Sequence, residues 1–136
     1  MATYTGGCAC GAVRYEVDAE PFRAFYCQCR ACQRATGTGH ASVIVFPRPA
    51  VKITGRIAEF GQTADSGAQM VRGFCPACGS PLYGTPQANP DYIGLFVGGL
   101  DDPACFKPQA VIFTGSGQPW DRLDPGLKTF AAKAGG

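Results

Sequence analysis

The pattern of apolar and polar side chains along the chain predicts many short strands. Residues 12–17 alternate apolar and polar side chains, as a strand with one buried face does. Further strands are predicted where short runs of β-branched, aromatic or aliphatic residues end near glycine or proline. These runs are residues 22–26, 41–46, 51–54, 57–61, 69–74, 82–84, 92–97 and 110–114. Helix is predicted only over residues 31–35 and, near the C-terminal end, over residues 126–134.

Composition favours an all-β chain as well. The 19 glycines and 11 prolines are spread over the whole sequence, which indicates tight turns between short strands more than long helices. No repeat or linker interrupts the pattern, so one domain over residues 1–136 is expected. With 46% hydrophobic residues, this chain can bury a core without cross-links, so its eight cysteines need another explanation.

Charge and hydropathy argue against several classes of partner. The 12 Lys and Arg residues nearly balance the 10 Asp and Glu residues, and no dense basic run indicates nucleic acid or an anionic membrane surface. No secretory signal is expected from the first residues, and the longest apolar runs are too short to span a bilayer. We therefore expect a cytoplasmic protein, in which clustered cysteines more often bind metal than form disulfides.

Seven of the eight cysteines fall into three tight groups, and Cys105 stands alone. The groups are Cys8 with Cys10, Cys27 with Cys29 and Cys32, and Cys75 with Cys78. In the last group, two cysteines three positions apart and followed by Gly79 form a turn that can aim both sulfurs at one tetrahedral ion. If Cys8 and Cys10 lie in a strand, their sulfurs point to one side as well. These four cysteines predict a closed structural zinc site, with two ordinary buried or disulfide-bonded pairs as the alternative.

The remaining group supplies three zinc ligands, Cys27, Cys29 and Cys32, from one short segment. Three protein ligands with an open fourth position are typical of a reactive zinc site, and a thiolate-rich zinc suits a substrate thiol as its fourth ligand. Zinc deprotonates a bound thiol, which is then a nucleophile at neutral pH. Two alternatives are a second structural site completed by His40 or Cys105, and a redox-active pair of Cys29 and Cys32.

Three motifs, in this order, resemble those of the glutathione-dependent formaldehyde-activating (GFA) family. They are residues 7–15 (GCACGAVRY), 27–37 (CQCRACQRATG) and 74–82 (FCPACGSPL), and the late pair Pro119 and Trp120 also fits. Together they span most of residues 4–120, the expected core, which leaves residues 121–136 as a short C-terminal helix or tail. The resemblance implies an all-β fold of several short curved antiparallel sheets, described as tent-like, organised around the four-cysteine zinc site.

The resemblance also implies a function. The family adds glutathione to formaldehyde to give S-hydroxymethylglutathione, which is a carbon–sulfur lyase reaction in the reverse sense. Structural zinc is then held by Cys8, Cys10, Cys75 and Cys78, and catalytic zinc by Cys27, Cys29 and Cys32. Two zinc ions per chain are expected, with the second site less fully occupied because three ligands hold zinc less tightly than four. One departure is Gln28, where the family often has histidine, because a carboxamide cannot relay a proton as imidazole does.

Four further residues are candidates for the substrate site. Arg30 and Arg34 lie four apart, so on one helical turn they would share a face beside the metal and could bind glutathione carboxylates, unless both are surface arginines. His40, the only histidine, is a candidate proton relay or a structural residue, and Trp120 lines the pocket or packs in the core. The expected partners are a glutathione-like thiol and a small aldehyde. The alternatives are a non-catalytic zinc-binding module and a family enzyme that acts on a different thiol adduct.

Overall fold

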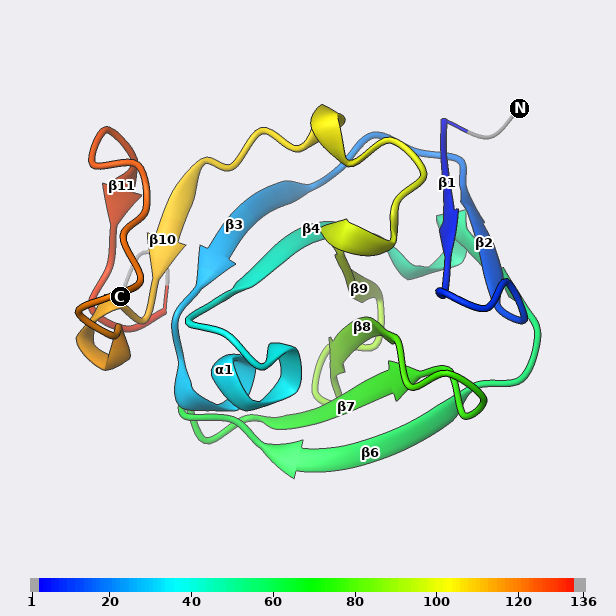
Figure 1. Cartoon of the computed structure of the whole chain (residues 1–136), viewed down its shortest axis with the longest axis horizontal. Coiled ribbons are helices and arrows are strands. Elements are labelled where there is room, and N and C mark those ends of the chain that lie inside the picture. Colours follow the sequence, from blue (N-terminus) through cyan, green and yellow to red (C-terminus); the bar gives the residue numbers. More distant parts are fainter. Residues whose placement is uncertain (1–2, 134–136) are drawn as a thin grey trace.

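The computed structural model describes residues 3–133 and consists mainly of strands (Figure 1). The strands are β1 (Tyr4–Gly7), β2 (Arg14–Val17), β3 (Arg23–Cys27), β4 (Ala41–Pro47), β5 (Val51–Thr54), β6 (Ala58–Thr63), β7 (Gln69–Phe74), β8 (Pro81–Pro86), β9 (Tyr92–Phe96), β10 (Ala110–Ile112) and β11 (Lys128–Thr129). The helices are α1 (Arg30–Thr36) and the 3-10 helices η1 (Arg48–Ala50), η2 (Val97–Gly99), η3 (Pro103–Cys105) and η4 (Thr114–Ser116). The prediction of an all-β fold is confirmed. Within the described residues, none of these helices has the length and apolar character that crossing a membrane requires.

Two sheets organise the strands. The smaller has the order β1-β2-β5 and is antiparallel throughout. The larger has the order β11-β10-β3-β4-β9-β8-β7-β6 and is antiparallel except at β10, which runs parallel to β3 and β11. In Figure 1 the larger sheet curls, so that β3 and β4 lie across from β6 and β7, with α1 between them. Since successive residues of a strand point to opposite faces, every second residue faces the inside of this curl.

The main core lies between the two sheets. Its largest fully buried side chains include Tyr15 and Val17 of β2, Phe46 of β4, and Ile93 and Leu95 of β9. Strand β2 alternates exposed and buried residues, as its sequence pattern predicted. One face of the central strands of the large sheet therefore packs against the small sheet, which leaves their other face free to line a cavity.

The C-terminal segment differs from its sequence prediction. The helix predicted over residues 126–134 is wrong within the described residues, where Lys128–Thr129 form β11 and residue 134 lies outside the description. The carbonyl groups of residues 130–132 accept hydrogen bonds from the backbone N–H groups of residues 113–115. The N–H of Phe130 also donates to the carbonyl of Val111, and a helix over these residues would need that N–H for its own hydrogen bonds, so pairing with the β10 region overrides local helix propensity.

Strand β1 is a second difference, because the sequence pattern does not predict it. Its two glycines, Gly6 and Gly7, weaken the strand signal. Glycine is nevertheless required at Gly6, because a Cβ there would lie 2.4 Å from the carbonyl oxygen of Gly99. The close approach of two backbones thus explains both the residue and the missed strand.

Candidate metal centres

Four of the predicted zinc ligands come together at two turns. They are Cys8 and Cys10 between β1 and β2, and Cys75 and Cys78 between β7 and β8. The first pair was expected to lie in a strand, but it lies in a turn. A left-handed glycine follows each pair, Gly11 at φ 80° and Gly79 at φ 77°, which explains the residue type. The N–H of Ala9 donates to Ser80 Oγ at 3.0 Å and ties the two turns together.

The spacing of these four sulfurs fits one zinc ion. Sulfurs that each lie about 2.3 Å from a tetrahedral zinc are about 3.8 Å from one another. The Sγ–Sγ distance is 3.6 Å between Cys8 and Cys10 and 3.8 Å between Cys10 and Cys75. All four sulfurs lie within 4.8 Å of one another. A disulfide requires an S–S distance of about 2.05 Å, and every one of these cysteines is free. The alternative of disulfide-bonded pairs is therefore wrong.

Hydrogen bonds favour a thiolate at two members of this four-cysteine cluster, Cys8 and Cys78. The backbone N–H of Val13 donates to Cys8 Sγ at 3.2 Å. Hydrogen bonds from the Ser80 side chain, and then from the backbone N–H groups of Ser80 and Cys10, lower the pKa of Cys78 to about 5. Since metal binding requires deprotonated sulfur, these bonds prepare the cluster for a cation.

The other three clustered cysteines lie where β3 passes into α1. Cys27 ends β3, Cys29 is the N-cap of α1, and Cys32 lies in the first helical turn. The N–H of Cys32 donates to Cys29 Sγ at 3.3 Å, as to an N-cap side chain, and Gly37 ends the helix with a left-handed φ of 73°. This strand-to-helix corner brings the three sulfurs within 4.8 Å of one another.

A buried glutamine fixes the corner. Gln33 is only 5% exposed, and its Nε2 donates to the carbonyl oxygens of Gln28 at 2.8 Å and Ser116 at 2.9 Å. Its Oε1 accepts a hydrogen bond from Gln118 Nε2 at 3.1 Å. Gln33 thus anchors α1 to the residue before the helix and to the segment around Ser116. The sequence gives no sign of this role, because a glutamine in a helical pattern usually faces solvent.

The three-cysteine cluster also favours a thiolate. Hydrogen bonds from Cys27 and Cys32 lower the pKa of Cys29 to about 3, and the contact with Cys29 raises the pKa of Cys27. Soft sulfur donors that share a negative charge fit zinc. Among residues 3–133, no fourth Cys, His, Asp or Glu joins this cluster, so His40 and Cys105 do not complete it.

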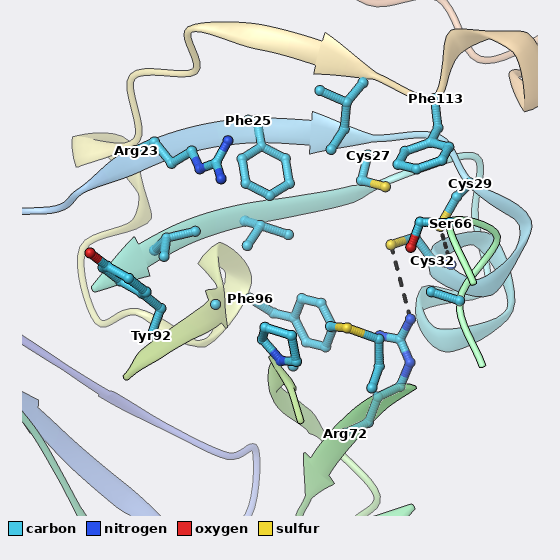
Figure 2. Close-up of a pocket in the computed structure, with 18 of the residues that line it drawn as sticks. Arg23, Phe25, Cys27, Cys29, Cys32, Ser66, Arg72, Tyr92, Phe96 and Phe113 are labelled. Carbon is cyan, nitrogen blue, oxygen red and sulfur yellow. Dashed lines mark hydrogen bonds between the residues drawn. The ribbon is translucent and has the colours of Figure 1, made fainter. Parts of the chain in front are cut away.

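A cavity of about 450 Å³ opens beside the three-cysteine cluster (Figure 2). Cys27, Cys29 and Cys32 all line it, and Phe113 lies beside them at the same end. Other lining residues come from the inner face of β3, β4, β7, β8 and β9 and from the β6–β7 hairpin tip. The volume is in the range of small-molecule sites, about 300–1,000 Å³. An ion held by these sulfurs would therefore have space for a further ligand.

Arg72 of β7 reaches the same end of the cavity, and sequence reasoning missed it. Its Nη2 lies 4.0 Å from Cys32 Sγ (Figure 2). Its Nε donates to Gln62 Oε1 at 2.9 Å, and its guanidinium lies 5.9 Å from the centre of the Phe96 ring. These two contacts hold a positive charge next to the sulfurs. Only the pairing of β7 within the curled sheet places it there, and no local motif indicates that pairing.

The two arginines proposed from the sequence lie elsewhere. Arg30 and Arg34 are exposed on α1, and neither lines the cavity beside the cysteines. The Arg30 guanidinium donates to the Gln33 side chain, and the Arg30 backbone N–H donates to Asp65 Oδ2 at 2.8 Å.

Gln28 and His40 meet at Asp121, away from that cavity. Gln28 Nε2 donates to Asp121 Oδ2 at 3.0 Å, and His40 Nδ1 lies 2.9 Å from Asp121 Oδ1. Neither Gln28 nor His40 lines the cavity. Trp120 is 64% exposed in a surface turn, so the prediction that it packs in the core is wrong, and it does not line this cavity either.

Comparison with known proteins gives a family match and a solved structure of similar fold. Residues 3–116 match the family model described as glutathione-dependent formaldehyde-activating enzyme. The crystal structure of a Rhodobacter sphaeroides protein superposes with a TM-score of 0.58 at 18% sequence identity, over 93% of this chain and 98% of that one. At that identity the likeness shows a shared fold alone.

Proposed function

This chain belongs to the glutathione-dependent formaldehyde-activating family, and on that premise we propose that it is a zinc-dependent enzyme of the carbon–sulfur lyase type. It adds glutathione or a similar thiol to a small aldehyde and forms an S-hydroxymethylglutathione-like product. One observation carries the proposal: Cys27, Cys29 and Cys32 converge without a fourth ligand from residues 3–133 and line a cavity of small-molecule size.

The two clusters have different proposed roles. The closed set of Cys8, Cys10, Cys75 and Cys78 holds a structural zinc that joins two turns far apart in the sequence. The open set holds the catalytic zinc, so two ions bind per chain when both sites are filled. A reducing compartment keeps such thiols free, which supports a cytoplasmic location, and residues 1–136 form one domain.

The proposed reaction forms one carbon–sulfur bond. Zinc held by the three thiolates would supply a Lewis acid that lowers the pKa of a thiol at its open position. The thiol sulfur attacks the carbonyl carbon, the C=O π bond breaks, and the proton lost by the thiol ends on the new hydroxyl group. The Arg72 guanidinium, 4.0 Å from Cys32 Sγ, donates toward the carbonyl oxygen as negative charge develops on it.

The arginines of α1 have a smaller proposed role. Arg30 and Arg34 are exposed, so they bind carboxylates of a thiol that extend outside the cavity. Exposed ion pairs contribute about 0–1 kcal/mol, so these contacts add little affinity. Gln28 takes no part in proton transfer, because its side chain is turned to Asp121.

Calorimetry with the zinc-loaded protein tests the proposal. Glutathione should bind at millimolar concentrations, while S-methylglutathione, which has no free thiol, should not. Addition of formaldehyde should then give S-hydroxymethylglutathione, followed by ¹³C NMR, faster than the uncatalysed reaction. A protein with two zinc ions per chain that binds no thiol would contradict the proposal.

A further inference from the structure

The cavity beside the three-cysteine cluster has a mostly apolar wall. Phe25 lies between Arg23 and Cys27 on the inner face of β3, and Figure 2 shows its ring turned toward the cavity. Val45 of β4 and Phe96 of β9 line the cavity as well. These strands are central in the large sheet, so their backbone groups are paired with neighbouring strands. The wall therefore offers contact area for an apolar group and few partners for peptide amides.

The size of the cavity exceeds what a one-carbon aldehyde needs. Its volume is about 450 Å³, and Gly84 and Gly94 place no side chain on its lining. Along β3, the four-residue step from Cys27 to Arg23 corresponds to about 13 Å at the rise of an antiparallel strand. A group as large as an aromatic ring fits between the end of the cavity at Cys27 and the end at Arg23.

Positive charge marks both ends of the cavity. Arg72 lies beside the sulfurs, whereas Arg23 lies at the remote end near Tyr92 (Figure 2). Arg23 is exposed, and its guanidinium lies 5.8 Å from the centre of the Phe25 ring. Within residues 3–133, no Asp or Glu oxygen lies within 4.0 Å of either guanidinium. Arg23 is thus free to bind an anion from a ligand.

We infer that this cavity selects a thiol, or its aldehyde adduct, whose sulfur is joined through an aromatic-sized apolar body to a carboxylate bound by Arg23. This inference rests on the proposed function and names its substrate class. Glutathione fits the wall less well, because it carries two peptide amides and an ammonium group. The acidic residue that lines the cavity, Asp65, already accepts a hydrogen bond from the Arg30 N–H.

Four thiol probes test the inference by calorimetry on the full zinc-loaded chain at neutral pH. They are 4-(2-mercaptoethyl)benzoate, with ring and anion, its neutral benzamide, 3-mercaptopropionate, with the anion alone, and glutathione. The benzoate should bind about fivefold more tightly than the benzamide, and at least about tenfold more tightly than 3-mercaptopropionate and glutathione. Because Val45 lines the apolar wall, Val45→Thr should weaken binding of the benzoate about threefold and leave binding of 3-mercaptopropionate unchanged.

Arginine variants locate the anion. Arg23→Gln should lower the benzoate affinity about fivefold, the upper end for an exposed ion pair, and leave the benzamide affinity unchanged. Arg56→Gln is the matched control, because Arg56 is also exposed and does not line the cavity. Equal effects of Arg23→Gln on benzoate and benzamide would overturn the assignment of Arg23.

Failure of the inference and failure of the proposed function give different results. If glutathione binds as tightly as the benzoate or more tightly, the inferred substrate class is wrong and the proposed function stands. If none of the four thiols binds to protein that holds two zinc ions, both are wrong.

Discussion

The two cysteine clusters use the same donor atom in opposite surroundings. The four-cysteine cluster joins two turns far apart in the sequence, and two of its members, Cys10 and Cys78, are exposed. The three-cysteine cluster lies within one short segment, and Cys27 and Cys29 are buried at the end of a cavity. Exposure alone would favour the four-cysteine cluster as the reactive one, whereas the proposed function assigns reactivity to the three-cysteine cluster.

The number of protein ligands, more than the exposure of the sulfurs, determines whether a bound zinc ion can also bind a substrate. Four sulfurs fill a tetrahedral ion and leave no position for a substrate, so the exposed cluster is closed in chemical terms. Three sulfurs leave one position, and the cavity gives that position room. The comparison therefore predicts that loss of one cluster removes the fold and loss of the other removes the chemistry.

The largest effect is expected from Cys78→Ser. Structural zinc in small domains contributes about 10–16 kcal/mol of apparent binding free energy to folding. The whole free energy of unfolding of a typical domain is about 5–15 kcal/mol. Cys78 is exposed, so its loss costs little packing and reports on the metal. We expect loss of the cooperative thermal transition in near-UV circular dichroism.

Cys105→Ser is the control for that variant, because Cys105 belongs to neither cluster. It should stay folded and keep two zinc ions per chain. If the Cys78→Ser protein had the wild-type melting temperature, the four-cysteine cluster would not have the proposed structural role.

The next effect separates chemistry from folding. Cys29→Ser should lower the zinc content from two ions to one while the circular dichroism spectrum stays native. Product formation should fall by more than about 100-fold, since changes outside the ligand shell already cost about 10–100-fold at metal sites. Zinc content is measured by mass spectrometry of the native protein. Retention of both ions with full activity would mean that the three cysteines do not hold the catalytic ion.

A smaller effect is expected from the arginine beside the sulfurs. Arg72→Gln should lower kcat about 100-fold, as loss of one donor to a developing oxyanion does, with zinc content and thiol affinity nearly unchanged. Arg34→Gln should change activity less than about fivefold, because exposed ion pairs contribute at most about 1 kcal/mol. Partial recovery in Arg72→Lys would support a charge effect. Equal losses in Arg72→Gln and Arg34→Gln would contradict the role of Arg72.

The smallest effect is a difference in metal release. On titration with a chelator, the first zinc should leave at a chelator concentration about tenfold lower than the second, because three ligands hold it and not four. Release of the first ion should leave the circular dichroism spectrum native, and release of the second should unfold the protein. Simultaneous release of both ions would show that the clusters do not differ in this way.

Sequence reasoning found the clusters because cysteine spacing is a local signal. The glycine after Cys78 indicated a tight turn, and Gly79 has the left-handed conformation that such a turn needs. Cys8 and Cys10 were expected in a strand, whereas they lie in a turn that ends at the left-handed Gly11. The strands of the large sheet other than β11 were predicted from their apolar runs for the same local reason.

Long-range pairing explains what the sequence did not reveal. Arg23 and Arg72 lie far apart in the chain, and they line one cavity because β3 and β7 belong to the same curled sheet. The pairing of β11 with β10 likewise replaced the predicted C-terminal helix. Trp120 is large and apolar, which favoured the core, yet it lies in an exposed turn that no pattern of its neighbours indicates.

The most direct measurement is a crystal structure of the zinc-loaded protein with a bound thiol, with anomalous scattering recorded at the zinc edge. We predict one zinc with four cysteine sulfurs at about 2.3 Å, and a second bound by Cys27, Cys29, Cys32 and the thiol sulfur facing the cavity. A second zinc closed by a fourth protein side chain, or no zinc at those three cysteines, would contradict the division into a closed and an open site.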